Sequence, residues 1–445
     1  MKLRRLKSKK TDERIAMLFC FLYPILPVYA SVFGINGRNL LCFIILLLTI
    51  LFTRNYKVKI YTPFSIVMIF AIWILGRFFQ VMISKSIPEA IYFLFLTVVM
   101  YYCLSKLVRS VDDFLSCIKA VLYGGYFVSI LGIFEEITHI NLFSYMNREY
   151  ELNYNPLRFG ILRIIGFSQH TIVHGVYIMF CMSLCLYMWQ FMKHLRKGKA
   201  FITVLYVLLS INLILTLSRS IIIITIISQL FILYLLGVRK FFRIIIKILL
   251  IGIPLLFLLS LIIPRVGDII RAGVLMVAAI FDDRAAATIS SAFGNDNLRG
   301  VGNRLDLYKW VLEKMPGRWL FGFGWNAEFS HSFTQSNGVY TWTQIKDSIE
   351  VQYLSTLYQY GLFGMITEIL TFVSLLFVCM KRNMKKRTWE PIIGFNRIAF
   401  ATFICYFLEM FAVNQSSDRY IFYLFAMLLL IYKKQNLEYG LLSKS

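Results

Sequence analysis

Charged residues are scarce in this chain of 445 residues. Asp, Glu, Lys and Arg make up 16% of it, against about a quarter in soluble domains, while hydrophobic residues make up 59%. The charges gather between long apolar runs, such as 40–52, 221–238 and 244–263. A soluble globular domain is therefore excluded, because these runs have the length of helices that cross a bilayer.

The apolar runs also lack the polar–apolar alternation of membrane β-barrel strands. The sequence therefore predicts an all-α polytopic membrane protein. At about 20 apolar residues per span, we expect about twelve transmembrane helices. They are predicted at 15–33, 39–53, 63–83, 89–108, 114–134, 170–192, 200–217, 219–237, 242–263, 352–380, 392–412 and 420–432.

Basic residues are unevenly distributed between the predicted spans. With a cytoplasmic amino terminus, inner loops such as 193–199 and 381–387 are basic, whereas outer turns such as 134–141 are poor in Lys and Arg. The positive-inside rule then predicts a multi-pass protein of the bacterial inner membrane with both termini cytoplasmic. The net charge of +24 reports this topology and an affinity for anionic lipids. Basic residues do not cluster on one face, so we expect no nucleic-acid partner.

Three regions follow from this topology. Residues 1–263 are predicted to hold transmembrane helices 1–9, residues 264–347 a large extracytoplasmic loop, and residues 348–445 helices 10–12 with a cytoplasmic tail. Loops of such length are usually functional or disordered. This loop is rich in Trp, Phe and Gly, so we expect it to be ordered. No internal repeat is evident.

Within the loop, residues 302–317 are expected to form an amphipathic helix that Pro316 and Gly317 end. The apolar side chains expected on one face of this helix are Leu305, Tyr308, Val311, Leu312 and Met315.

Cysteine is absent from this large loop, and all eight cysteines lie in or beside predicted spans. A disulfide framework and a Cys-based zinc motif are therefore not expected, and the cysteines are interpreted as small apolar packing residues.

Arginines on the predicted outer side are the first candidate site residues. Arg219, in TLSRSIII (216–223), stands at the head of a strongly apolar helix, a costly place unless it meets an anion or water. Its planar guanidinium suits phosphate oxygens. Arg163 and Arg304 lie in the two long outer segments. The alternatives are a snorkelling Arg219 at the interface and a solvated loop with acidic neighbours.

Three proton acceptors near the tenth predicted span are the second set of candidates. His331, Asp347 or Glu350 could deprotonate a hydroxyl group if held near the arginines, although each could equally be a surface polar residue. His170 and His174 have a zinc-like spacing, but HTIVH lacks the glutamate of H-E-x-x-H and a third ligand. We therefore expect neither a metal nor a cofactor.

Aromatic residues crowd the same outer loop. They suit stacking on sugar rings or an interfacial belt at headgroup depth. These residues are Trp319, Phe321, Phe323, Trp325, Phe329, Phe333, Tyr340 and Trp342.

Four stretches, in this order, resemble the O-antigen ligase/polymerase family of Wzy- and WaaL-like membrane enzymes. LRIIGFSQHTIVHG (162–175) is similar to the family's arginine-bearing stretch before a helix, and TLSRS (216–220) to its mid-chain arginine segment. GNRLDLYKWVLEKMPGRWLFGFGW (302–325) resembles its large periplasmic loop, and EVQYLSTLYQYGLFG (350–364) its re-entry into the membrane.

The resemblance implies a metal-independent, GT-C-like glycosyltransferase whose donor is a glycan on undecaprenyl diphosphate. Arg219, Arg304 and Arg163 would bind the diphosphate, and Glu350 would act as the base, with Asp347 and His331 as alternates. Ligases of the family usually carry a histidine where this chain has Glu350, which favours a polymerase. An alignment shifted by one turn would place Asp347 there instead.

The predicted function is therefore polymerisation of lipid-linked repeats into O-antigen, capsule or exopolysaccharide, in the bilayer and with a chain-length regulator and a flippase as possible partners. Three alternatives remain open: a ligase of the same family, a flippase or other transporter, and a non-catalytic scaffold. A transporter would use charges within predicted spans, namely Arg77, Glu368, Arg397 and Glu409, yet the two similar halves common in transporters are not evident.

Overall fold

A computed structural model describes most of the chain, in segments separated by gaps. The described residues are 2–27, 29–32, 35–53, 64–84, 87–146, 161–168, 170–191, 196–237, 246, 250, 253–262, 267, 302–324, 327–336, 341–380, 390–411, 413–414 and 419–442. The helices are α1 (Lys2–Ile25), α2 (Gly37–Thr53), α3 (Phe64–Ser84), α4 (Ile87–Leu94), a π-helical turn (Phe95–Val99), α5 (Met100–Leu107), α6 (Val111–Thr138), a 3₁₀ turn (Leu142–Met146), α7 (Thr171–Phe191), α8 (Arg196–Leu215), α9 (Arg219–Leu236), α11 (Ile253–Ile262), α14 (Gly302–Lys314), α15 (Gln352–Met380), α16 (Glu390–Glu409) and α17 (Arg419–Leu442). The strands are β1 (Ser31–Val32), β2 (Ile35–Asn36), β3 (His331–Ser336) and β4 (Thr341–Lys346).

The helices fall on the predicted spans, and within the described residues five are long and apolar enough to cross a membrane: α6, α7, α8, α9 and α15. Shorter apolar helices accompany them at 37–53, 66–76 and 91–107. The protein is thus a mostly helical polytopic membrane protein. The count of twelve stays a prediction, because the predicted span 242–263 is described as a helix only over α11.

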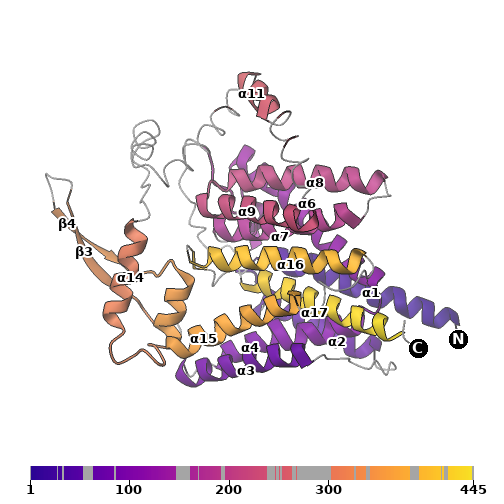
Figure 1. Cartoon of the computed structure of the whole chain (residues 1–445), viewed down its shortest axis with the longest axis horizontal. Helices are drawn as coiled ribbons and strands as arrows, with labels where there is room; N and C mark the ends of the chain where they lie inside the picture. Colours follow the sequence, from indigo (N-terminus) through magenta and orange to yellow (C-terminus); the bar gives the residue numbers. More distant parts are fainter. Residues whose placement is uncertain are drawn as a thin grey trace.

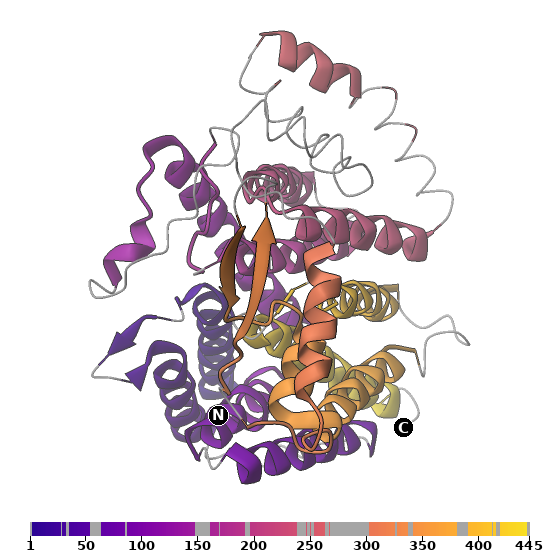
Figure 2. The same cartoon turned by 90° about the vertical axis from the view of Figure 1, so that its left-hand side faces the viewer.

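The bundle has two unlike ends. Figure 1 shows α14, β3 and β4 beyond one end, here called the loop end, and both chain termini at the opposite end. Figure 2 looks onto the loop end, where α14 and the β3–β4 hairpin lie in front of the bundle helices. The described part of the loop, from α14 to β4, and the termini therefore lie at opposite ends, while the compartment that each end faces stays a prediction.

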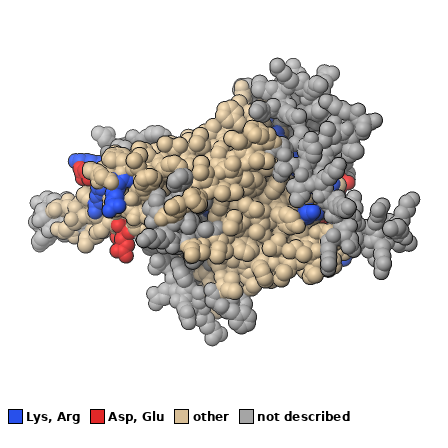
Figure 3. Space-filling model, turned by 90° about the horizontal axis from the view of Figure 1, so that it is seen from below, with Lys and Arg blue, Asp and Glu red and all other residues tan. Residues whose placement is uncertain are grey.

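Charge on the surface follows the same division. Figure 3 shows Lys, Arg, Asp and Glu toward the two ends of the molecule, with a broad middle of almost only other residues. Exposed apolar side chains on the bundle helices include Phe78, Ile74 and Ile369. Apolar side chains exposed along whole helices are expected where lipid, not water, is the neighbour.

Two helices form the centre of the bundle. In α7, 94% of the most apolar stretch is buried inside the protein, against 33% in α8 and in α9. Helix α7 is therefore surrounded by protein, whereas α8 and α9 each keep an apolar face that is not covered by protein. Helix α17 is buried from Tyr420 to Tyr432. Its Phe425 ring lies 4.7 Å from the Phe180 ring of α7 in a tilted arrangement, and Tyr406 of α16 stacks on Phe422. Aromatic packing thus joins α7, α16 and α17.

Helix α15 is broken at Gly361, where φ is 66° and ψ is −167°. Its second part, 362–380, is ~28 Å long at 1.5 Å per residue, about the thickness of a bilayer core. The first part, 352–360, precedes the bundle and packs beside α14 (Figure 1). The single predicted span 352–380 is therefore two helical segments, since a residue without a Cβ atom allows the left-handed break.

The loop end corrects the all-α prediction. Strands β3 and β4 pair antiparallel, with His331 opposite Lys346, and a second short hairpin joins β1 to β2. The β4 sequence TWTQIK is rich in β-branched and aromatic residues. Outside the bilayer a hairpin can satisfy its edge groups with water, so helix is no longer the obligatory element.

Helix α14 forms where it was predicted, but its buried face is rotated. Leu307, Val311 and Met315 are almost fully buried, whereas Leu312 keeps 40% of its surface exposed. The buried residues share a cluster with Ile349 and Leu354 of the α15 start. The i, i+4, i+8 stripe that contacts α15 therefore decides the face, and the predicted place of Leu312 on it was wrong.

Candidate functional site

Arg163 lies at the loop end, in the short segment 161–168 before α7. Its Nε donates a hydrogen bond to the Thr216 carbonyl at 3.2 Å, and its Nη2 donates to Thr171 Oγ1 at 2.8 Å. Thr216 and Thr171 are fully buried, and the arginine is half-buried. The guanidinium is therefore held in place between the start of α7 and the α8–α9 turn.

A buried carboxylate shapes the segment that carries Arg163. Glu135, near the end of α6, accepts hydrogen bonds from the Ile165 amide at 3.2 Å and the Gly166 amide at 2.9 Å. Asn141 Nδ2 donates to the Gly166 carbonyl at 2.8 Å. Both sides of the Gly166 peptide turn are thus held by side chains, which limits where Arg163 can lie.

Arg219 is the first residue of α9, three positions after Thr216. The turn between them is tight, because Leu217 adopts a left-handed φ of 47° while fully buried. A bulky residue in this region stores backbone strain, which is commonly found at functional sites. The turn between α8 and α9 therefore binds Arg163 through the Thr216 carbonyl and also begins the helix that Arg219 starts. Both arginines thus lie at the loop end.

His170 connects the arginine side to Glu350. Burial lowers the pKa of His170 from its usual 6.5, the positive charge of Arg163 lowers it further, and the carboxylate of Glu350 acts in the opposite direction. His170 is nonetheless exposed to solvent, so the lowered pKa reflects the protein around the ring and not complete coverage. The charges of the predicted phosphate-binding Arg163 and of the predicted base Glu350 therefore both act on this histidine.

Glu350 itself is loosely held. It forms an ion pair with Lys346, the last residue of β4, and keeps 52% of its side chain exposed. An exposed pair of this kind contributes little stability. The carboxylate can therefore turn toward a substrate without a large energetic cost.

The other predicted site residues have different surroundings. Asp347 is exposed after β4, and the His331 ring stacks on Trp310 of α14 at 4.5 Å, with 16° between the planes. Arg304 lies in the first turn of α14, and its side chain is outside the described residues. Arg163 and Glu350 thus both lie within electrostatic range of His170, while His331 is occupied in packing the hairpin on α14.

The two histidines with zinc-like spacing do not converge. His174 is fully buried, with its Nε2 3.5 Å from Asn212 Oδ1, whereas His170 Nδ1 accepts from the Ile172 amide at 3.2 Å. Across the described parts of the chain, no group of three His, Cys, Asp or Glu side chains is placed to hold a metal ion.

Some site residues escaped sequence reasoning. Lys346, Thr171 and Thr216 have no signal of their own, because they act through contacts that only folding creates. Glu135 had one, since a carboxylate at the end of an apolar run is costly unless it is hydrogen-bonded.

Comparison with known proteins places the middle of the chain in a family. Residues 204–369 match the sequence model Wzy_C, described as O-antigen ligase. None of the curated proteins compared with the chain matches it. The matched stretch runs from α8 through α15 and contains Arg219, Arg304 and Glu350, and it confirms the resemblance in the sequence. Over residues 204–369 the chain is thus similar to the O-antigen ligase domain that Wzy polymerases and WaaL ligases share, in a family whose members act on lipid-linked glycans.

Proposed function

We propose that the protein is a polymerase that joins undecaprenyl-diphosphate-linked oligosaccharide repeats into a surface polysaccharide at the extracytoplasmic face of the inner membrane. The carrying observation is that a fixed guanidinium, Arg163 held by Thr216 and Thr171, and an accessible carboxylate, Glu350 after β4, both lie at the loop end. A fixed cation for a leaving diphosphate and a carboxylate for an attacking hydroxyl are the two charges that this transfer needs at one place.

The arginines account for the leaving group. As the bond between the anomeric carbon and the diphosphate oxygen breaks, its electron pair stays on the diphosphate. Arg163 and Arg219, with Arg304 from α14, neutralise the developing charge. Arg163 is already fixed by Thr216 and Thr171, so its guanidinium need not reorganise during the reaction, which is the condition for efficient electrostatic stabilisation.

Glu350 accounts for the acceptor. Its carboxylate removes the proton from an acceptor hydroxyl group while that oxygen forms the new bond to the anomeric carbon. The exposed position and the single Lys346 partner leave it accessible to a sugar. Asp347 and His331 are the alternates, and the stacking of His331 on Trp310 makes it the weaker one. The proposed step uses no metal ion and no cofactor.

The choice of polymerase over ligase rests on Glu350, which stands where ligases of the family usually carry a histidine. A polymerase also fits a pathway that contains a flippase and a chain-length regulator as neighbours. The proposed topology places both termini in the cytoplasm and the loop end outside, where flipped lipid-linked repeats are available.

The test is the length of the lipid-linked glycan in a deletion strain complemented with wild type or with Arg219→Ala at equal membrane abundance. We expect single repeats on their carrier in the deletion strain and with Arg219→Ala, and a ladder only with wild type. Long chains that stay on the carrier in the deletion strain would identify a ligase. Repeats confined to the cytoplasmic leaflet would identify a flippase.

A further inference from the structure

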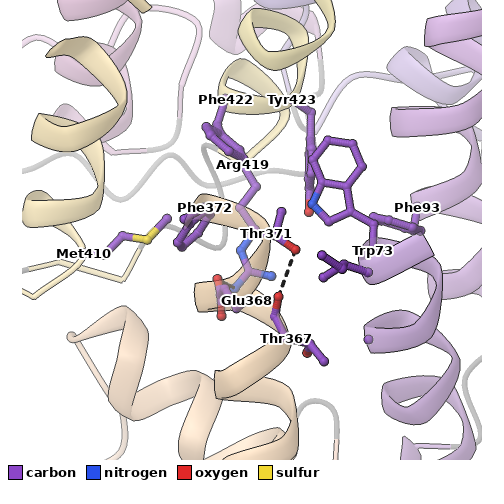
Figure 4. Close-up of a pocket in the computed structure, with 12 residues that line it drawn as sticks. Trp73, Phe93, Thr367, Glu368, Thr371, Phe372, Met410, Arg419, Phe422 and Tyr423 are labelled. Atoms are coloured by element: carbon purple, nitrogen blue, oxygen red, sulfur yellow. Dashed lines mark hydrogen bonds and ion pairs between the residues drawn. The ribbon is translucent and has the colours of Figure 1, made fainter. Parts of the chain in front are cut away.

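A cavity of about 40 Å³ lies between α3, α15 and α17, apart from the Arg163 site. Figure 4 shows Trp73 of α3 on one side and Arg419 and Glu368 on the other, with side chains from both walls directed into one space. Glu368 comes two turns after the break in α15, and Arg419 begins α17. The cavity thus lies in the part of the bundle that borders the loop end.

The two charged side chains at this cavity form an ion pair that is not completely buried. Arg419 Nη2 lies 3.0 Å from Glu368 Oε1, and the two side chains keep 19% and 13% of their surface exposed. An ion pair this close to apolar surroundings persists only with further hydrogen bonds, and Thr356 Oγ1 supplies one to Glu368 Oε2 at 2.6 Å. Because the pair is neutral overall, the cavity has no net charge with which to attract a diphosphate.

One strong donor at the cavity has no acceptor. Trp73 is 4% exposed, and its indole N–H finds no hydrogen-bond partner among the described residues. Burial of such a group is costly unless a ligand or water accepts the bond. Two groups that could accept hydrogen bonds from a ligand also line the cavity. The hydroxyls of Thr371 and Thr367 donate their protons to backbone carbonyls, so their oxygen lone pairs remain available to a ligand.

The rest of the lining is mostly apolar and consists of four aromatic rings with Ile72, Gly76 and Met410. Phe93, Phe372, Phe422 and Tyr423 surround the polar groups. A ligand for this site must combine hydroxyl groups, each both donor and acceptor, with apolar C–H faces. Among the molecules of the proposed reaction, a sugar ring has this combination, whereas a diphosphate and a polyprenyl chain do not. At about 10–15 Å³ per water-sized group, a cavity of about 40 Å³ admits the hydroxyl-bearing edge of one ring.

The cavity is also connected to the candidate base. Thr356 Oγ1, which donates to Glu368, accepts a hydrogen bond from Gln352 Nε2 at 2.9 Å. Gln352 begins α15, two residues after Glu350. A chain of hydrogen bonds therefore runs from the carboxylate of the cavity to the segment that positions the base. A sugar held in the cavity would present its neighbouring hydroxyl groups on the Glu350 side of α15.

We infer that this cavity is the acceptor subsite of the transferase, taking the hydroxyl-bearing edge of a neutral sugar residue at the non-reducing end of the acceptor repeat. This assignment rests on the proposed function. Arg163 and Arg219 then serve the donor diphosphate on the α7–α9 side, and Trp73, Thr371 and the Glu368–Arg419 pair serve the acceptor on the α3–α17 side, with Glu350 between.

The test separates donor from acceptor with two substrates in proteoliposomes. The donor is the undecaprenyl-diphosphate-linked repeat extracted from the deletion strain, and the acceptor is the same repeat as a benzyl glycoside, which lacks a leaving diphosphate. We expect Trp73→Phe and Thr371→Val each to raise the acceptor KM roughly fivefold, the effect of one lost hydrogen bond, with the donor KM unchanged. Matched controls are Trp189→Phe and Thr203→Val, at exposed positions of α7 and α8.

A binding measurement keeps this assignment separate from catalysis. Excess benzyl glycoside should raise the unfolding temperature of detergent-purified wild type and of both controls, but raise it less in Thr371→Val, a nearly isosteric change expected to fold. Equal shifts in all four proteins, or none in wild type, would overturn the acceptor subsite and leave a cavity for water only. A normal shift in wild type without any transfer would instead overturn the polymerase.

Discussion

The Arg163 side and the Glu350 side of the candidate site are held very differently. Arg163 is fixed by two buried partners, and Glu135 and Asn141 in turn hold its segment. Glu350 is itself exposed, has the half-buried Lys346 as its ion-pair partner, and follows a hairpin at the edge of the molecule. The side proposed for the diphosphate is thus pre-organised, and the side proposed for the acceptor is free to adjust.

This difference matches the chemistry of each side. Every donor presents the same diphosphate, so rigid cations suit it and lower the reorganisation cost. A base on an adjustable segment can follow the acceptor hydroxyl group of the proposed reaction as it approaches the anomeric carbon. If the two sides are held so differently, substitutions on the Arg163 side and on the Glu350 side should differ in their effects on the transfer rate and on the substrate KM.

The largest effect is expected from Glu350→Gln, which keeps the size of the side chain and removes its basicity. The rate of glycan transfer should fall about 100- to 10,000-fold, the usual contribution of a general base. Lys346→Met, which removes the half-buried ion-pair partner, should change the rate less than tenfold. Transfer measured in proteoliposomes with both variants decides this, and equal losses would mean that the hairpin anchor is as essential as the base.

Arg163→Ala should lower the transfer rate about 100- to 1000-fold, because one pre-organised partner of the developing charge is lost. Arg163→Lys should recover only part of it, since lysine cannot reach Thr216 and Thr171 with a planar fork. The exposed loop arginine Arg318 provides the control, with activity close to wild type after Arg318→Ala. An inactive control variant would indicate general dependence on loop charge.

Glu135→Gln tests whether the rigid side owes its order to the buried carboxylate. The amide can accept one of the two backbone hydrogen bonds but brings a donor into the site, which costs about 1–3 kcal/mol. We expect a roughly tenfold rise in the donor KM with a smaller change in kcat. A loss of kcat alone, at normal donor affinity, would show that Glu135 does not act through Arg163.

The break in α15 can be tested by two glycines with similar backbone conformation. Gly322 has a φ of 70°, and a Cβ there would lie 2.6 Å from the Gln359 carbonyl, whereas Gly317 has a φ of 79° with open space around it. Gly317→Ala should cost about 1–2 kcal/mol for its conformation alone. Gly322→Ala should cost clearly more, measured as a larger drop in unfolding temperature. Equal drops would mean that the close contact between residue 322 and the Gln359 backbone adds nothing to stability.

The smallest effect concerns pH and His170. Its pKa lies below 6.5 in the folded protein because of burial and Arg163. Above pH 6.5 the ring is neutral in both states and adds no pH dependence. As pH falls below 6.5, the unfolded chain takes up a proton that the folded protein resists, so stability falls until the lowered pKa is passed. His170→Gln should flatten the unfolding temperature over this range, and an unchanged acid slope would contradict it.

Local sequence was informative where one physical rule dominates. Lipid leaves an apolar run only one element, so the helices α6–α9 and α16 lie close to their predicted positions. The arginine of TLSRS was found because charge in lipid is costly. By contrast, Gly361 stands in an apolar run that reads as one helix, and its break depends on Gly322 and the backbone of 319–324. Leu307 and Leu312 lie on different faces of α14, and only the contact with α15 decides which of the two faces is buried.

By itself the sequence determined that the chain is a helical membrane protein, and its motifs pointed to the O-antigen ligase family, whose model residues 204–369 match. Hydrophobic length and charge asymmetry are local properties that the bilayer reads directly. Only the tertiary structure decided that the charges of Arg163 and Glu350 both act on His170, that Glu135 holds the arginine segment, and that Trp73 faces Glu368 across a cavity. Those pairs are far apart along the chain, and their approach depends on the packing of whole helices, which no local pattern encodes.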